Sequence, residues 1–158
     1  MDSPRQPAGG DTAATAEALY GLITGAVRRM NRDISLTSAA VLSTVERTGP
    51  RRITDLAAIE GVAQPSMTAL VSNLERAGLV ERQRDAEDQR VVLVALTPAG
   101  ADYLRARRRA GADAFARLIT KLPPAEAQAL LAATPALVHL RDLDNERPLT
   151  QDRGQQDA

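Results

Sequence analysis

The 158-residue sequence predicts a mainly α-helical fold that includes one small β-hairpin, an α+β arrangement. Apolar side chains recur at helical spacing through most of the chain, whereas residues 79–83 and 91–96 are predicted to be strands. Period two is kept over residues 91–96, although both faces there are apolar. Proline and glycine separate these segments, as at Gly49-Pro50, Gly78 and Pro123-Pro124. The chain is long enough for one domain with a hydrophobic core.

Composition excludes several classes of function. The chain has no cysteine, so disulfides, thiol redox sensing and cysteine-ligated metals are excluded. Aromatic residues make up only 2%, which argues against stacking on unpaired bases. No apolar run approaches the ~20 residues of a membrane span, and the N-terminus MDSPRQPAGGD lacks the apolar segment of a secretory signal. We therefore expect a cytoplasmic protein.

Charge is unevenly distributed, although the net charge is zero. Residues 47–109 carry eleven Arg against eight acidic residues, a net charge of +3. Residues 1–46 carry −1 (four basic, five acidic) and residues 110–158 carry −2 (five basic, seven acidic). A basic centre between acidic flanks is expected if only the centre meets phosphate groups. The bias is too small to assign a function by itself.

The N-terminal region is expected to be a tail followed by a long amphipathic helix. Residues 1–12 are Pro, Gly and polar residues, which predicts a mobile tail. Thr12 would cap a helix over about residues 13–31. Its apolar stripe consists of Ala16, Leu19, Tyr20, Ile23, Val27 and Met30.

A second helix is predicted to begin with Thr37 as its cap and to end at Gly49-Pro50. Residues 51–53 then form a short extended link. Ile53 could pair with the hairpin as a third small strand.

Residues 54–97 contain the motif that identifies the predicted fold. Thr54 would cap a short helix, Gly61 would supply a turn, and a second helix would run from Gln64 to about Ala77 with Pro65 in its first turn. The two strands follow. Helix, tight turn, helix and hairpin is the layout of a winged helix-turn-helix, which holds its second helix in the DNA major groove.

The second helix of this motif has two distinct faces. Met67, Leu70, Val71 and Leu74 form the predicted buried stripe. The opposite face is small or amide-bearing, which lets a helix enter a groove and hydrogen-bond base edges or phosphates. Its candidate DNA contacts are Gln64, Pro65, Ser66, Thr68, Ala69, Ser72, Asn73 and Arg76, of which Gln64, Ser66, Thr68, Ala69 and Ser72 would read bases.

An ordinary solvated helix face is the alternative for these residues. Exposed helix faces usually carry Glu and Lys, whereas Glu75 is the only acidic residue from Gln64 to Ala77. The composition therefore favours a polyanion as the partner. The usual Ser or Thr cap is replaced by Ala63, which leaves Gln64 to cap this helix.

The hairpin tip, residues 84–90, is charged and is expected to project. An Asp88–Arg90 pair could brace the loop and direct a guanidinium into the minor groove. Taken in isolation, the tip is explained better as a solvated charged turn. The wing residues assigned to DNA are Arg82, Arg84, Asp88, Gln89 and Arg90.

Two long helices are predicted after the hairpin. Thr97 caps the first, whose inner side would be Leu104, Phe115, Leu118, Ile119 and Leu122. The last helix would cover about residues 125–143 with a kink at Pro135, and residues 144–158 would form a flexible tail. Arg108, beside the apolar stripe, would either form an intersubunit or interdomain salt bridge or reach solvent. His139 is assigned to packing or to the surface.

The hairpin and its flanks resemble the MarR family of bacterial winged-helix regulators. The match consists of an acidic-x-Arg tip and a strand that ends in Leu-Thr-x-x-Gly, and the similarity extends over about residues 13–143. The residues that carry it are Leu74-Glu75-Arg76-Ala77-Gly78-Leu79-Val80-Glu81-Arg82, then Asp85, Asp88-Gln89-Arg90, and Leu96-Thr97-Pro98-Ala99-Gly100.

The resemblance implies a homodimer that binds pseudo-palindromic double-stranded DNA as a transcriptional regulator, in the repressor role. It also implies a small phenolic or aromatic effector between the dimerisation and DNA-binding regions. On this basis residues 13–34 and 98–143 form the dimerisation region and residues 35–97 the DNA-binding domain. Pocket candidates are Tyr20, Val27, Leu36 and Phe115, which plain core packing explains better. Phosphate candidates are Thr37, Arg47, Arg51, Arg52 and Thr54; solvated surface charge explains the three arginines equally well.

Several positions depart from the family pattern. The basic residues often found at Ala69 and Asn73 are missing, and Gln89 stands where a second basic residue often precedes the tip arginine. A winged-helix module that binds proteins rather than DNA therefore remains the alternative. No catalytic triad, phosphate-binding glycine loop or metal-ligand cluster is present, so no enzyme, metal or cofactor is expected.

Overall fold

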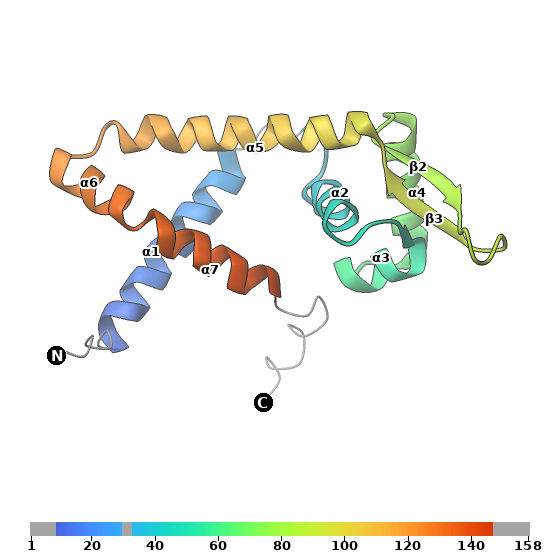
Figure 1. The fold of residues 1–158 in the computed structure, drawn as a ribbon, viewed down its shortest axis with the longest axis horizontal. Coiled ribbons are helices and arrows are strands. Elements are labelled where there is room, and N and C mark those ends of the chain that lie inside the picture. The colour runs from blue at the N-terminus through green and yellow to red at the C-terminus, as the bar shows by residue number, and fades with distance from the viewer. Residues whose placement is uncertain (1–8, 30–32, 147–158) are drawn as a thin grey trace. The chain divides into compact units, whose positions relative to one another are not determined.

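The computed structural model describes residues 9–29 and 33–146, and the chain divides into two units, residues 1–33 and 34–158 (Figure 1). The first unit contains one described helix, α1 (Gly9–Arg29). The second contains a winged helix-turn-helix followed by three helices. Its elements are α2 (Leu36–Thr48), β1 (Arg51–Arg52), α3 (Ile53–Glu60), α4 (Gln64–Arg76), β2 (Val80–Arg84), β3 (Val92–Leu96), α5 (Pro98–Ile119), α6 (Pro124–Ala132) and α7 (Thr134–Glu146).

Helix α1 begins at Gly9, so the prediction of a tail through residue 12 is wrong for residues 9–12. Thr12 lies inside the helix and is not its cap. Asp11 occupies the first turn, where its negative charge favours the helix dipole, and its carbonyl oxygen accepts a hydrogen bond from Thr15 Oγ1 at 2.8 Å. Residues 1–8, and the predicted end of this helix at residues 30–31, lie outside the described residues.

Helix α2 is capped by Ser35 rather than by Thr37. Ser35 has an extended backbone, and its Oγ accepts a hydrogen bond from the Ser38 N–H at 3.0 Å. Thr37, predicted to be the cap, lies within the helix. Gly49, with φ of 77°, ends the helix as expected, because glycine adopts this left-handed region without strain.

The link after α2 forms a strand one residue earlier than predicted. Arg51 and Arg52 pair with β3, and Ile53 is already the first residue of α3. Since Arg52 must remain extended for this pairing, it occupies the N-cap position, and no side chain caps the helix. Thr54, the predicted cap, instead lies inside α3, where its hydroxyl donates to Asp55 Oδ1 at 3.4 Å.

The three strands form an antiparallel sheet in the order β1-β3-β2. Val80 pairs with Leu96 and Arg84 pairs with Val92, which places the hairpin tip between Arg84 and Val92. The strands begin one residue later than predicted. Gly61, with φ of 60°, makes the turn between α3 and α4 as the sequence indicated.

The hydrophobic core lies where α2, α3 and α4 meet the sheet and the start of α5. Met67, Val71 and Leu74 are buried as predicted, and Leu70 and Val62 pack against them partly buried. The core therefore fixes which face of α4 remains outside. Its other members are Val41, Leu42, Val45, Leu56, Ala57, Leu79, Val80, Val94 and Leu104.

The C-terminal part contains α5 and two separate helices instead of one kinked helix. The chain breaks at Ala133, and Pro135 lies in the first turn of α7. Proline has no N–H to donate and its ring clashes with the carbonyl four residues earlier, so α6 cannot continue through it. Helix α7 extends through Glu146, three residues into the predicted tail.

Most apolar residues of these helices are exposed in the single chain. Leu104 is buried and Ile119 partly buried, but Phe115, Leu118 and Leu122 are exposed, so the predicted inner side of α5 is wrong for this chain by itself. His139 is exposed. Across the described residues, no helix combines the length and apolarity required to span a bilayer.

Candidate nucleic-acid interface

Helix α4 ends in a backbone motif that sets the direction of the wing. The Leu79 N–H donates to the Leu74 carbonyl at 3.0 Å, and the Gly78 N–H donates to the Glu75 carbonyl at 2.9 Å. With φ of 72° at Gly78, this pair of bonds is the Schellman motif. Helix α4 ends at Arg76 and β2 begins at Val80, so only Ala77, Gly78 and Leu79 join this helix to the wing.

The outer face of α4 presents the residues that the sequence assigned to DNA. Seven of the eight are exposed, and Ser72 is half-buried. The hydroxyls of Thr68 and Ser72 donate to the carbonyls of Gln64 and Thr68, at 3.0 Å and 2.9 Å. The Thr68 oxygen therefore keeps its lone pairs for base donors such as the adenine or cytosine amino group, whereas Ser72 Oγ already accepts a hydrogen bond from Arg82 Nη2 at 3.0 Å.

The start of α4 has no side-chain cap. Ala63 occupies the N-cap position, and Gln64 is the first residue of the helix and caps nothing. The expectation that Gln64 replaces the usual cap is therefore wrong. At the other end, the Arg76 guanidinium donates to the Asn73 side-chain oxygen, which orders these two residues on the exposed face.

The hairpin tip is folded by its acidic residues. Asp85 Oδ1 accepts the backbone N–H groups of Glu87 and Asp88 at 2.8 Å and 3.1 Å, and these bonds hold the pKa of Asp85 below its ordinary value. Asp88 Oδ1 accepts the Arg90 backbone N–H at 3.0 Å. These carboxylates shape the loop from within.

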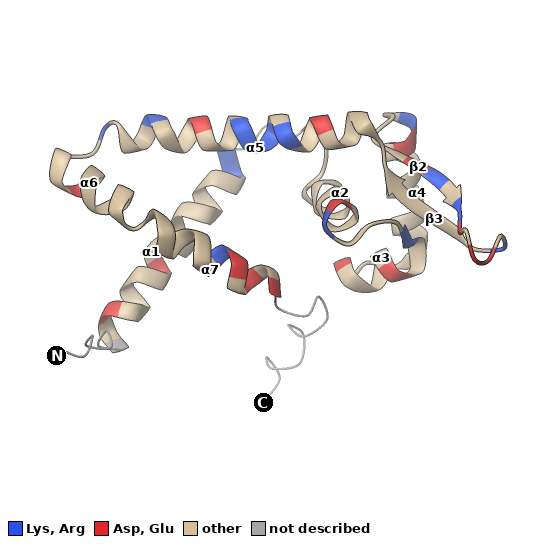
Figure 2. Ribbon diagram, in the orientation of Figure 1, with Lys and Arg blue, Asp and Glu red and all other residues tan. Residues whose placement is uncertain are grey.

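The tip arginines have different partners. Arg84 Nη1 donates to the Gln89 carbonyl at 2.6 Å, across the base of the loop. The predicted Asp88–Arg90 ion pair is absent from the described residues, because Asp88 binds the backbone of Arg90 and leaves its guanidinium exposed. Arg82 differs from both, since its contacts reach α4. Figure 2 shows the basic residues along β2 and the acidic residues in the projecting loop.

The wing is anchored to α5 through Thr97. Its hydroxyl donates to the Gly78 carbonyl at 2.7 Å and accepts the Gly100 N–H at 3.0 Å, so Thr97 both caps α5 and binds the turn after α4. The sequence predicted the cap but missed the bond to Gly78, and it missed the close packing of Gly100 on the backbone of Leu79. The Leu-Thr-x-x-Gly spacing was the signal that could have revealed both.

The residues proposed to contact phosphate lie in different surroundings. Thr37 and Arg51 are half-buried, and Arg51 Nε donates to Thr48 Oγ1 at 3.0 Å. Arg52 and Thr54 are exposed at the start of α3. Arg47 instead lines a hollow beside α2.

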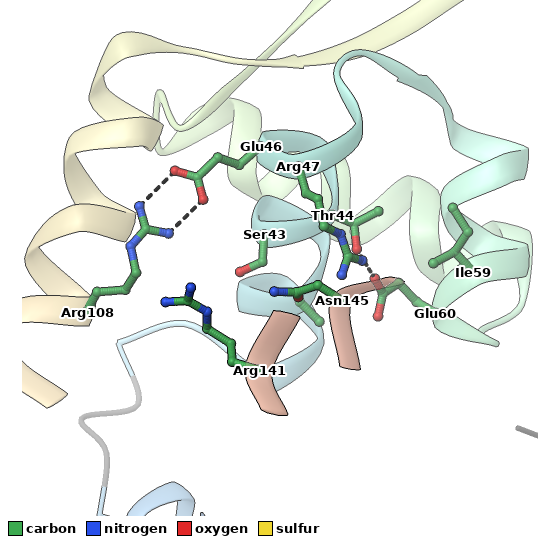
Figure 3. Close-up of a pocket in the computed structure, with 10 residues that line it drawn as sticks. Ser43, Thr44, Glu46, Arg47, Ile59, Glu60, Arg108, Arg141 and Asn145 are labelled. Carbon is green, nitrogen blue, oxygen red and sulfur yellow. Dashed lines mark hydrogen bonds and ion pairs between the residues drawn. The ribbon is translucent and has the colours of Figure 1, made fainter. Parts of the chain in front are cut away.

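This hollow, of about 650 Å³, is bounded by residues of α2, α3, α5 and α7 (Figure 3). On one side Arg108 of α5 forms a bidentate ion pair with Glu46 of α2. Its Nη1 donates to Glu46 Oε2 at 2.7 Å and its Nη2 donates to Glu46 Oε1 at 2.8 Å. The pair lowers the pKa of Glu46 and raises that of Arg108, chiefly through the hydrogen bonds. Of the alternatives for Arg108, a salt bridge within the chain is the one observed.

None of the four pocket candidates lines the hollow. Tyr20 is 70% exposed, Leu36 46% and Phe115 37%, and Val27 is half-buried. Their expected role as plain core is therefore wrong for the single chain. Among the described residues, no group of three or more side chains is placed to hold a metal ion.

Comparisons with known proteins agree with this geometry. A sequence model of the MarR family matches residues 34–92. The chain is 31% identical over 115 residues to an HTH-type transcriptional regulator of Mycobacterium tuberculosis, covering 73% of this chain and 80% of that protein.

Solved structures share the fold. A transcriptional regulator of Thermotoga maritima aligns with a TM-score of 0.72 at 19% identity, covering 88% of this chain and 99% of the other. A mutant of Staphylococcus aureus MepR bound to an oligodeoxyribonucleotide aligns with a TM-score of 0.61 at 20% identity, covering 82% and 96%.

Proposed function

Because this chain belongs to the MarR family of transcriptional regulators, we propose that it represses transcription as a homodimer bound to pseudo-palindromic operators. Members of the family are DNA-binding regulators rather than enzymes. The observation that carries the proposal is the outer face of α4, which is exposed, small and amide-bearing, beside a tip that presents Arg90. The MepR–oligodeoxyribonucleotide complex supports the same use of this fold.

In the proposed complex, α4 lies in the major groove and the hairpin reaches the flanking minor groove. Ser66, Thr68 and Ala69 face base edges from the first half of α4, and Ala69 suits a thymine methyl group. Arg90 enters the minor groove, while Arg84 and Gln89 lie along the backbone. Arg52 and Thr54, exposed at the start of α3, face phosphates.

Homodimerisation is supported by apolar surface that the single chain leaves uncovered. Monomeric soluble proteins rarely expose large contiguous apolar patches. Here α7 alone exposes Leu137, Val138, Leu140 and Leu143, and Leu131 of α6 is 63% exposed. A second copy packed on these helices would place two α4 helices about one DNA turn apart.

A small phenolic or aromatic ligand is proposed as the signal that releases DNA. The support is the hollow beside α2, where Arg108 and Glu46 link α5 to the DNA-binding domain. Arg47 and Arg141 also line it, and either guanidinium would suit a phenolate or carboxylate.

Selection of bound genomic fragments at physiological salt, with and without candidate phenolic ligands, tests this function. We expect an enriched inverted repeat, dimers in analytical ultracentrifugation, and affinity that falls steeply with salt. The missing basic residues at Ala69 and Asn73 favour a second candidate, a protein-binding module. Weak, salt-insensitive binding to every fragment would support that alternative.

A further inference from the structure

Arg82 binds the recognition helix rather than projecting from the wing. Its Nη1 lies 3.2 Å from Glu75 Oε2, and its Nη2 donates to Ser72 Oγ at 3.0 Å. Alternate residues of a strand share a face, so Arg82 lies on the same face of β2 as Val80, which is buried in the core. Both contacts therefore join the base of the wing to α4.

The contact of Arg82 with Glu75 is important because Glu75 places a negative charge on α4. It is the only acidic residue of α4, and it follows Thr68 and Ser72 along one edge of the helix at spacings of four and three. Its side chain is 37% exposed. Without a partner, this carboxylate would stand beside the candidate base-reading residues and repel phosphate groups.

We propose that Arg82 is a positioning residue of the DNA-binding surface: it neutralises Glu75, holds Ser72, and makes no phosphate or groove contact of its own. This inference rests on the proposed binding of DNA. It changes the role that the sequence assigned to Arg82. Arg90 provides the contrast, because its guanidinium has no hydrogen bond or ion pair among the described residues.

The test compares wild-type protein with Arg82→Gln, Glu75→Gln and the double variant. Two 30-base-pair duplexes serve as probes: the sequence most enriched in the genomic selection and a scrambled version of it. Fluorescence anisotropy at a series of salt concentrations gives both the affinity and the slope of log K against log salt. Circular dichroism melts confirm that each variant is folded.

Arg82→Gln should weaken binding to both duplexes on the order of tenfold, because Glu75 then faces phosphate unpaired. Glu75→Gln should bind at least as tightly as wild type. The double variant restores the net charge of the pair, so its affinity should return to within about threefold of wild type. Its salt slope should equal that of wild type.

A direct phosphate contact predicts a different result. The double variant would bind no better than Arg82→Gln, and its slope would be shallower by about 0.9. Either result, or wild-type affinity in Arg82→Gln, overturns the proposal. Arg90→Gln is the matched control, and its slope should be shallower than that of wild type by about 0.9. Failure of the wild-type protein to bind either duplex would instead reject the proposed function.

Discussion

The first turn of α5 rests directly on the backbone of Leu79, and Gly100 is the residue that permits it. A Cβ atom at position 100 would lie 2.1 Å from the Leu79 carbonyl oxygen and 2.8 Å from Leu96 Cδ1. The Leu79 carbonyl also accepts the Thr97 N–H at 3.2 Å, so it cannot move away without loss of that bond. The glycine of the Leu-Thr-x-x-Gly motif is therefore required by close packing.

Gly100→Ala should lower the free energy of unfolding by about 1–3 kcal/mol or more, because a backbone atom blocks the added methyl group. Gly111→Ala, in the same helix, is the matched control, since nothing lies within 4 Å of its Cβ position. That change should stabilise the protein by about 0.5–1 kcal/mol, as alanine does inside helices. Urea unfolding at fixed protein concentration measures both, and equal effects would contradict the packing role of Gly100.

The cap of α2 gives a second contrast. Ser35→Ala removes the bond to the Ser38 N–H and should cost about 1 kcal/mol of unfolding free energy. Thr37→Ala should change it by less than about 0.5 kcal/mol, because Thr37 lies within the helix. If thermal or urea unfolding ranked Thr37→Ala as the more damaging change, the assignment of Ser35 as cap would be wrong.

The wing prediction concerns Arg90. Arg90→Ala should weaken operator binding by about 1–3 kcal/mol, since an exposed guanidinium at the tip would be lost from the minor groove. Arg117→Ala, exposed near the end of α5, should leave the affinity unchanged. Gel-shift titration with the selected operator provides the measurement, and unchanged affinity in Arg90→Ala would reject the wing contact.

The ion pair between Glu46 and Arg108 predicts a dependence of stability on pH. The folded pKa of Glu46 is lowered below 4.5, so its contribution is complete above pH 4.5 and is lost as the pH falls through the folded pKa. Side-chain exposures of 31% and 56% limit the pair to at most about 1 kcal/mol.

Wild type and Glu46→Gln should therefore differ most above pH 4.5 and converge as the pH falls toward 3. Urea unfolding across this range gives the difference in free energy. A gap that persists undiminished at pH 3 would show that titration of Glu46 is not its source.

The buried face of α4 could be predicted from the sequence, whereas the caps of α2 and α3 could not. The stripe of Met67, Val71 and Leu74 identified the buried face of α4 because helical spacing is a property of the chain alone. Thr37 and Thr54 failed as caps because a cap needs an extended backbone at its own position. That backbone is set by contacts such as the pairing of Arg52 with Leu93.

In the candidate DNA-binding site, too, some features could be predicted from the sequence and others could not. Exposure of most outer residues of α4 followed from the position of its buried stripe. The partners of Arg82 and Asp88 did not follow, because each could bind several neighbours. Ser72 and Glu75 precede Arg82 by ten and seven residues, and only the turn at Gly78 brings them together.

The junction at Gly78 and Leu79 has a mechanical consequence. Their N–H groups close α4, their carbonyls hold Thr97 at the start of α5, and the chain continues directly into β2. Three elements thus meet at these two residues, which are held by backbone hydrogen bonds and by the hydroxyl of Thr97. A shift of the first turn of α5 would therefore act on the end of α4 and on the start of the hairpin together, through Thr97 and the backbone of these two residues.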